Sequence, residues 1–274
     1  MSRPGTFGVD ESGRDVVWDH FAAMHSVIQG ATRSGKSVLA YAVLADAARD
    51  PRIRVVGVDP SGLLLAPHRR GDDDALIHLG TADPEAACQV VERLVRMMDK
   101  RIRILLERGL DSVPKYVHRR AFPLFLIVFE ELPAILSWLD GEDQGRKPGE
   151  KFAPRMRLAM GRLLRESAKA GMRVSPVLIQ RAEVANLPER AQYARRVSMR
   201  VDNRASVELL MELATPEDVD RIMGLRLGQG VIHEAGEPLR YFRADYLEYA
   251  DYRAAVLAAR AGDPRREVVS DGAA

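Results

Sequence analysis

A glycine-rich run at residues 30–37 constrains this chain more than any other feature of its sequence. It reads Gly-Ala-Thr-Arg-Ser-Gly-Lys-Ser and fits the phosphate-loop pattern G-x-x-x-x-G-K-[S/T]. A short apolar strand is predicted before it, over residues 25–29, and a helix after it, over residues 38–49. A strand–loop–helix unit of this kind aims backbone amides and the positive end of a helix dipole at one anion. The run therefore predicts a nucleotide site.

Each part of the loop has an expected role. Gly30 and Gly35 allow the tight turn that points successive N–H groups inward. Lys36 is expected to contact the β- and γ-phosphates of ATP, and the Ser37 hydroxyl to hold Mg²⁺. The predicted ATP-binding residues are Gly30, Ala31, Thr32, Arg33, Ser34, Gly35, Lys36, Ser37 and Val38.

Two carboxylates follow the most apolar stretch of the chain, residues 124–129, which predicts a central strand covered on both faces. Glu130 is expected at the end of a strand neighbouring the phosphate loop, where it would face Mg²⁺. Glu131 is expected to polarise the attacking water. Most such sites carry Asp at the first position, and the extra methylene of Glu130 moves its carboxylate by roughly 1.5 Å. Two solvated acids are the alternative interpretation.

Gln180 ends a further apolar strand, predicted over residues 173–180. Its side chain is expected to face the γ-phosphate from beside the acidic strand, as a sensor or as a water-positioning group. An ordinary glutamine at a strand end is the alternative.

Strands and helices alternate along most of the chain. The sequence patterns also predict two short strands within residues 5–18, helices from Asp83 to Gly109 and over 154–170, a strand over 196–201, helices over 204–213 and 216–223, and a closing hairpin at 230–243. The alternation predicts an α/β fold with a mainly parallel sheet and helices on both faces. We expect one domain over residues 1–262: a strand pair (5–24), a core (25–245) and a C-terminal helix (246–262). A disordered tail is expected at 263–274.

Composition excludes several classes of protein. Hydrophobic residues make up 46% and charged residues 29%, as in soluble globular proteins. No apolar run approaches the roughly 20 residues that span a bilayer, and the N-terminus does not look like a secretory signal, so a cytoplasmic location is expected. Cys88 is the only cysteine, which excludes an intrachain disulfide and a cysteine metal cluster. A net charge of +2 neither demands nor excludes nucleic acid.

Several segments together resemble the FtsK/SpoIIIE–HerA family of DNA-pumping ATPases. Residues 25–38 resemble the family's PHLLVAGATGSGKSV, and residues 58–62 are similar to its DPKGG. Residues 127–132 stand where the family has VVVDELA, residues 169–181 resemble RAAGIHVVLATQRP, and residues 228–231 are similar to GRGLV. The resemblance covers residues 5–245. The strand pair before the loop and the small size resemble the transfer ATPases of actinobacterial conjugative elements.

The resemblance implies a RecA-like P-loop NTPase core that uses ATP and Mg²⁺ and works as a homo-oligomeric ring, a hexamer, around double-stranded DNA. A role in conjugative transfer of a mobile element is one possibility that it raises. No membrane segment is predicted and no winged-helix DNA-orienting domain fits after residue 250, so membrane anchoring and sequence-directed loading would need another protein or another mechanism. An arginine from the neighbouring subunit would complete each ATP site. The family's arginine falls near residues 168–169, which leaves Arg165, Lys169 and Arg204 as candidates.

In the family, DNA-contacting loops follow the acidic strand and the sensor strand. The implied DNA-binding residues here are Arg146, Lys147, Lys151, Arg155, Arg181 and Arg190. Phosphate contacts need charge and no base readout, so basic side chains on such loops suffice. A solvated polar loop is the alternative, and it is favoured by the acids Asp140, Glu142, Asp143 and Glu150.

Two other functions stay open. One is an ATPase of the same superfamily that moves protein, which a test for DNA-stimulated activity distinguishes. The other is a nucleotide-binding scaffold with little hydrolysis, favoured by Glu130 in the acidic motif and by the displaced arginine.

Overall fold

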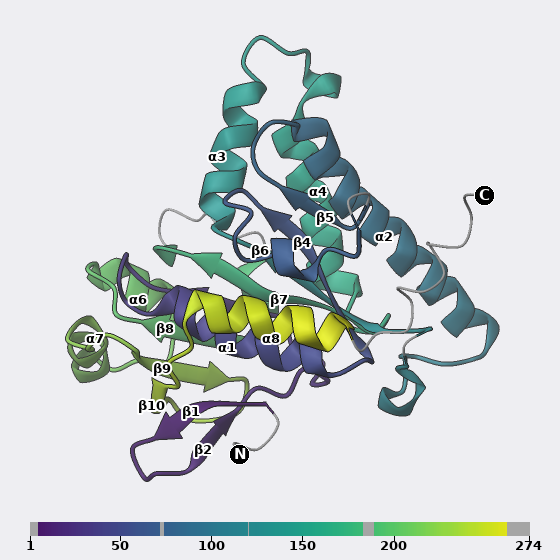
Figure 1. Cartoon of the computed structure of the whole chain (residues 1–274). Helices are drawn as coiled ribbons and strands as arrows, with labels where there is room; N and C mark the ends of the chain where they lie inside the picture. The colour runs from purple at the N-terminus through teal and green to yellow at the C-terminus, as the bar shows by residue number, and fades with distance from the viewer. Residues whose placement is uncertain (1–4, 72–73, 120, 183–188, 262–274) are drawn as a thin grey trace.

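The computed structural model describes residues 5–71, 74–119, 121–182 and 189–261, so the tail expected at 263–274 lies outside the described residues. Within the described residues, ten strands form a single sheet in the order β2-β1-β10-β9-β8-β3-β7-β6-β4-β5 (Figure 1). The strands are β1 (Thr6–Asp10), β2 (Asp15–Val17), β3 (Ser26–Gln29), β4 (Ile53–Asp59), β5 (Ile77–Leu79), β6 (Leu124–Phe129), β7 (Met172–Ile179), β8 (Arg195–Met199), β9 (Gln229–Glu234) and β10 (Arg240–Ala244). The helices are α1 (Lys36–Arg49), α2 (Pro84–Glu107), α3 (Leu132–Glu142), α4 (Phe152–Glu166), α6 (Arg204–Leu210), α7 (Pro216–Met223) and α8 (Tyr249–Ala261).

The sheet is mixed but mainly parallel, as predicted. All strand pairs from β8 across to β5 are parallel, whereas β9, β10, β1 and β2 extend the sheet through antiparallel pairs. One detail differs from the expectation: β7 lies between β3 and β6, so the acidic strand is not the immediate neighbour of the phosphate-loop strand. The ends of β3, β7 and β6 still meet at one edge, because the three strands run in the same direction.

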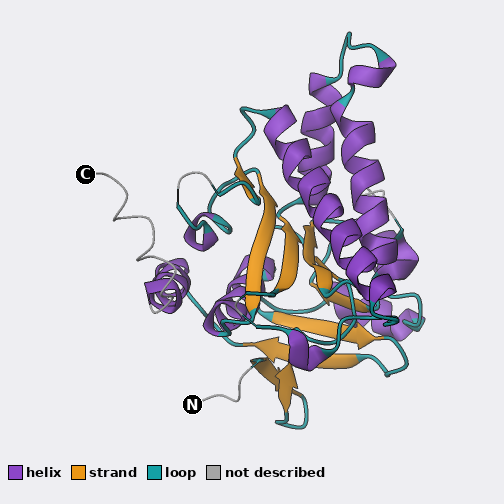
Figure 2. Cartoon of the chain, turned by 90° about the vertical axis from the view of Figure 1, so that its right-hand side faces the viewer, coloured by secondary structure: helices purple, strands orange, loops and turns teal. Residues whose placement is uncertain are grey.

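Helices cover both faces of the sheet, and this explains the continuous apolar run of β6. Leu124, Leu126 and Val128 share one hydrophobic cluster with residues of α1 and α8. Phe125, Ile127 and Phe129 share the other cluster with residues of α2, α3 and α4. Successive side chains of a strand point to opposite faces, so both faces of a doubly covered strand are buried and apolar residues are favoured throughout it. Figure 2 shows the strands between helices on two sides.

The sequence analysis did not predict β5 or α3. In α3, Ile135, Leu136 and Leu139 are buried, yet the helix follows β6 almost directly. Glu131 occupies its N-cap position with a left-handed φ of 52° and makes no side-chain cap, so Pro133 in the first turn is the sequence signal that remained for this helix start.

The start of α4 depends on a contact made from outside the helix. It begins at Phe152, not at the predicted residue 154. The carboxylate of Asp143 accepts hydrogen bonds from the amides of Phe152 (2.6 Å) and Ala153 (2.9 Å). A cap placed nine residues before the helix leaves no local sequence pattern.

The predicted N-terminal strand pair is present and joins the main sheet through β1 and β10. Asp10 closes its turn, because one carboxylate oxygen accepts from the amides of Ser12 and Arg14, both at 2.9 Å. At the other end of the chain, α8 lies along α1 (Figure 1). Among the described residues, no helix combines the length and the apolar character that crossing a membrane requires.

Candidate nucleotide site

The glycine-rich loop leaves β3 at the carboxyl edge of the sheet and turns into α1. The Gly30 amide donates to the carbonyl of Ile179 (3.1 Å), and the Ala31 amide donates to the carbonyl of Arg200 (2.9 Å). The loop is therefore fixed to the ends of β7 and β8, the strands on either side of β3. Lys36 is the first residue of α1, and the first amides of a helix have no partner within it. The loop thus presents free N–H groups at this edge, as a phosphate requires.

The backbone of the loop has room only for glycine at both glycine positions of the motif. A Cβ atom at Gly30 would lie 2.4 Å from Ser34 Oγ and 2.9 Å from Met199 Cβ. Gly35 has a φ of +101°, and a Cβ there would lie 3.1 Å from the Cα of Gly228. The tight turn predicted from the sequence is therefore present, and Met199 and Gly228, which lie outside the motif, pack against it.

Three predicted site residues come together at the carboxyl edge. The carboxylate of Glu131 accepts a hydrogen bond from Lys36 Nζ through Oε2, at 2.7 Å. Its Oε1 accepts from the backbone amide of Gln180, at 3.1 Å. The Gln180 side chain is exposed, so in this structure the contact made at position 180 is a main-chain contact. The phosphate loop, the acidic strand and the sensor strand thus share one site.

Glu130 lies in a more acidic environment than the sequence suggested. Burial raises its pKa to about 7, with further contributions from the charges of Asp59 and Glu131, whereas Lys36 opposes the shift. Asp59, at the end of β4, is fully buried. Its carboxylate accepts from the amides of Ser61 (2.9 Å) and Leu65 (2.8 Å) and so holds the turn after the strand.

The sequence analysis gave Asp59 no role. An Asp-Pro-Ser-Gly run after a strand is a turn signal in which the Asp side chain bonds the following amides, and this signal was available. The turn places a second buried carboxylate next to the acidic pair of β6.

The acidic pair and the loop suit a magnesium ion bound together with a nucleotide. In the described part of the chain, no group of three or more His, Cys, Asp or Glu side chains could hold a metal ion by itself. Mg²⁺ is usually held through one or two protein ligands together with substrate phosphates. The exposed hydroxyl of Ser37 and the carboxylate of Glu130 are the groups that would hold it, and the ion would neutralise phosphate charge there.

A tyrosine that the sequence analysis did not select borders the same site. Tyr41 lies four residues after Ser37, on the same side of α1. Its ring stacks on Tyr252 of α8, with centroids 4.8 Å apart and an angle of 17°. Burial, then the charges of Tyr249, Glu130 and Asp59, raise the pKa of Tyr41. The C-terminal helix is therefore anchored next to the acidic residues.

The three candidates for a basic side chain that acts between subunits do not lie at one edge of the sheet. Arg165, near the end of α4, pairs with Glu189, and Lys169 is exposed just before β7 begins, at the amino edge. Arg204 follows β8 at the carboxyl edge and pairs with Asp220. Arg165 and Lys169 are therefore far from Lys36 of the same chain, and either would serve only a neighbouring chain.

The first stretch of implied DNA-binding residues lies mainly at the exposed tip between α3 and α4. Arg146 and Lys147 are exposed there, and Lys151 is half-buried. Two of the acids that favoured a solvated loop are used structurally: Asp143 caps α4, and Asp140 pairs with Arg157 at 2.7 Å. Glu142 and Glu150 remain exposed beside Arg146 and Lys147, so the tip carries charges of both signs.

The other implied DNA-binding residues do not share one surface. Arg155 is engaged by Glu85 (2.6 Å) and Glu92 (2.9 Å) of α2, so its guanidinium joins two helices. Arg181 follows β7 at the carboxyl edge and bonds Asp202, whereas Arg190 lies near the amino edge, where β8 begins. The connection between Arg181 and Arg190 includes residues 183–188, which lie outside the described residues.

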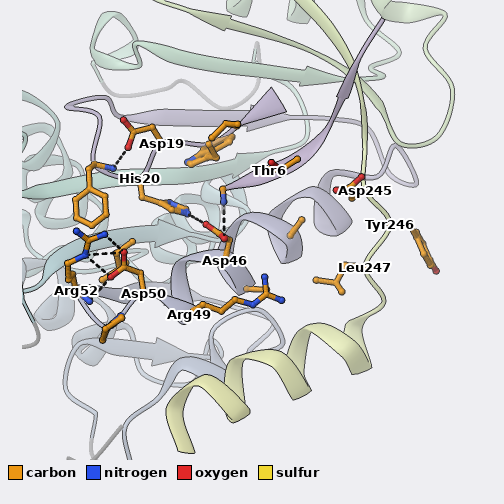
Figure 3. A pocket seen from close by; sticks show the side chains of 18 residues that line it. Thr6, Asp19, His20, Asp46, Arg49, Asp50, Arg52, Asp245, Tyr246 and Leu247 are labelled. Atoms are coloured by element: carbon orange, nitrogen blue, oxygen red, sulfur yellow. Dashed lines mark hydrogen bonds and ion pairs between the residues drawn. The ribbon is translucent and has the colours of Figure 1, made fainter. Parts of the chain in front are cut away.

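A hollow of about 1200 Å³ lies away from these residues, between the N-terminal strand pair and α1 (Figure 3). None of the residues singled out from the sequence lines it. Figure 3 shows His20 pointing toward Asp46, at 3.2 Å, and Arg52 paired with Asp50. The first contact joins the segment after β2 to α1, and the second closes the turn between α1 and β4.

Comparison with known proteins agrees with this geometry. Residues 1–234 match the FtsK/SpoIIIE family. DNA translocase SftA of Bacillus subtilis (strain 168) is 26% identical over 212 residues, 74% of this chain and 21% of that protein. DNA translocase FtsK of Chlorobaculum tepidum is 23% identical over 222 residues, 76% of this chain and 27% of that protein. The chain thus spans a minor part of the length of these curated relatives.

The fold has a close counterpart among solved structures. The monomer of the pCW3 conjugation coupling protein TcpA with ATPγS superimposes with a TM-score of 0.71 and 19% identity, over 95% of this chain and 72% of that one. This likeness confirms the predicted P-loop NTPase fold, and the match over residues 1–234 confirms the predicted class of P-loop ATPase. The chain belongs to the FtsK/SpoIIIE family.

Proposed function

We propose that this chain hydrolyses ATP and uses the energy to move along double-stranded DNA. The observation that carries the enzymatic part is the convergence of Lys36, Glu131 and the Gln180 amide at the carboxyl edge of the sheet. The DNA part is supported by the family and by relatives that are themselves DNA translocases.

In the proposed reaction, water attacks the γ-phosphorus of ATP, and the bond to the bridging oxygen of ADP breaks. The amides of the phosphate loop and Lys36 hold the phosphates and stabilise the charge that develops on them. Glu131 accepts the proton of the attacking water, and Gln180 orients it. A basic side chain of a second chain, with Arg165, Lys169 and Arg204 as the candidates, would complete the site.

The proposed assembly is a homo-oligomeric ring, a hexamer, around the DNA. Phosphate contacts would come from the tip formed by Arg146, Lys147 and Lys151, with Arg181 at the carboxyl edge as a further candidate. We also propose a cytoplasmic setting, a separate membrane-anchoring protein and a role in conjugative transfer. The fold likeness to a conjugation coupling protein motivates the last of these.

Duplex DNA is expected to stimulate ATP hydrolysis, and the stimulation is expected to fall steeply between 50 and 200 mM salt. The reason is that phosphate contacts release counterions, so affinity falls with salt in proportion to their number. The measurement is the ATPase rate with and without duplex DNA across a salt series, on material sized by chromatography. Activity that is indifferent to DNA would contradict DNA translocation and favour an ATPase that moves protein. Nucleotide binding without turnover would favour a scaffold.

Removing the charges of the tip is expected to weaken DNA binding without changing ATP binding. In the double variant Arg146→Ala/Lys147→Ala, the slope of log affinity against log salt should fall by about two, one for each lost phosphate contact. Arg157→Ala is the matched control, because Asp140 already neutralises Arg157 beside the tip. Fluorescence anisotropy with labelled duplex measures both. An unchanged slope in the double variant would place the DNA elsewhere.

A further inference from the structure

A short segment outside the predicted nucleotide motif packs directly on the phosphate loop. The amide of Gly228 donates to the carbonyl of Ser34, at 3.1 Å. Gly228 is also the backbone that a Cβ atom at Gly35 would meet, at 3.1 Å from both its N and Cα atoms. Residues 226–228 therefore lie beside the loop, just before β9 begins at Gln229.

The segment lies on the flank of the loop opposite the acidic residues. On one flank, Gly30 bonds the end of β7, where the Gln180 amide holds Glu131. On the other flank, Ala31 bonds the carbonyl of Arg200 after β8, and β9 follows β8 in the sheet. The loop thus separates a catalytic flank from the flank that carries residues 226–228.

Because ATP is elongated, its γ-phosphate and its base lie on opposite flanks of the loop. Hydrolysis requires the γ-phosphate to lie next to Glu131, on the β7 and β6 side. The base is at the far end of the same elongated molecule, beyond the α-phosphate. A nucleotide held by the phosphate loop with its γ-phosphate at Glu131 therefore extends its base toward β8 and β9.

Leu227 is an apolar side chain next to Gly228 on that flank. It is 70% exposed, so a ligand that covers it removes apolar surface from water. The segment around it is held in place: the Arg226 amide donates to Gln229 Oε1 at 2.9 Å, and the Ala244 amide donates to the Gly228 carbonyl at 2.8 Å. A fixed backbone presents Leu227 at a constant position, which lowers the entropy cost of binding.

We propose that Leu227 packs against the nucleobase and that residues 226–228 form the base end of the nucleotide site. The inference rests on the proposed phosphate site at Lys36 and Ser37. An apolar side chain contacts the face of any base, so this contact favours nucleoside triphosphates over bare polyphosphate and does not select adenine over guanine.

The test is equilibrium binding of ATP, GTP and inorganic tripolyphosphate by calorimetry, without turnover. Leu227→Ala is expected to weaken ATP and GTP binding about five- to tenfold, since part of a buried leucine side chain is lost. Tripolyphosphate binding should stay the same. Leu158→Ala is the matched control, because Leu158 is similarly exposed, at 67%, but lies on α4 and not beside the phosphate loop. Leu227→Met should retain most of the affinity.

Other outcomes would overturn the inference. ATP binding that is unchanged in Leu227→Ala, or weakened only as much as tripolyphosphate binding, would show that Leu227 does not touch the base. Wild-type protein that binds tripolyphosphate as tightly as ATP would show that no base site exists. Lys36→Ala should weaken all three ligands. If it weakens none of them, the phosphate site itself is wrong, and that failure is distinct from a failure at Leu227.

Discussion

Glu131→Gln is expected to lower kcat for ATP hydrolysis by about a hundred- to ten-thousandfold, the usual contribution of a general base. ATP binding should be retained or become tighter. The reason is in the structure: Lys36 Nζ bonds the carboxylate of Glu131 at 2.7 Å, so this carboxylate competes with a phosphate for the lysine. Glutamine keeps a similar shape and a hydrogen-bonding oxygen but removes the negative charge. Steady-state ATPase rates and calorimetric ATP binding would measure the two effects separately.

Glu142→Gln is the matched control for this variant. It makes the same chemical change at the other end of α3, where Glu142 is exposed. Its kcat should equal that of the wild type. Measurable hydrolysis that survives Glu131→Gln unchanged would remove Glu131 from the mechanism. If the wild type is a scaffold without ATPase activity, its hydrolysis rate will equal that of Lys36→Ala.

Gly35→Ala is expected to weaken ATP binding by about ten- to a hundredfold. The backbone at Gly35 has a φ of +101°, and a left-handed conformation costs a non-glycine residue about 1–2 kcal/mol. The added Cβ also meets the backbone of Gly228 at 3.1 Å, and this neighbour is held by its bonds to Ser34 and Ala244. The loop would have to shift, and with it the amides that face the phosphates. Calorimetric ATP binding measures the loss.

Gly145→Ala separates the effect of the left-handed backbone conformation from the effect of the close contact with Gly228. Gly145 has a comparable φ of +77° but nothing within 4 Å of its added Cβ, and it lies at the tip between α3 and α4. This variant should lower the free energy of unfolding by about 1 kcal/mol and leave ATP binding unchanged. Thermal unfolding of both variants checks that Gly35→Ala remains folded. Equal ATP binding in Gly35→Ala and the wild type would contradict the packed loop.

Much of the fold could be predicted because its signals are local. The run from Gly30 to Ser37 is contiguous, and the apolar residues 124–129 predict a strand that is buried on both faces. The meeting of Lys36, Glu131 and Gln180 followed from a general property of parallel sheets, whose carboxyl ends share one edge. The bond from the Gln180 backbone amide to Glu131 was not predicted, and the role of the Gln180 side chain toward the γ-phosphate stays a prediction.

Other features could not be predicted because the residues concerned meet only after folding. Asp143 caps a helix from nine residues away, and Arg155 joins α4 to two glutamates of α2 across 63 and 70 residues of sequence. Both residues looked like surface charges when judged by their neighbours in sequence. The family's loop positions likewise grouped Arg181 with Arg190, which lie toward opposite edges of the sheet.

The sequence by itself determined that this chain has a phosphate loop, a doubly covered parallel sheet and an acidic pair at a strand end. These depend on residue order within single elements, where backbone preference and burial act locally. Tertiary structure alone decided that β7 lies between β3 and β6, that Asp59 lies beside Glu130, and that Gly228 packs on Gly35. Strand order and close backbone contact depend on how distant segments pack together, and that packing is set by the whole chain at once.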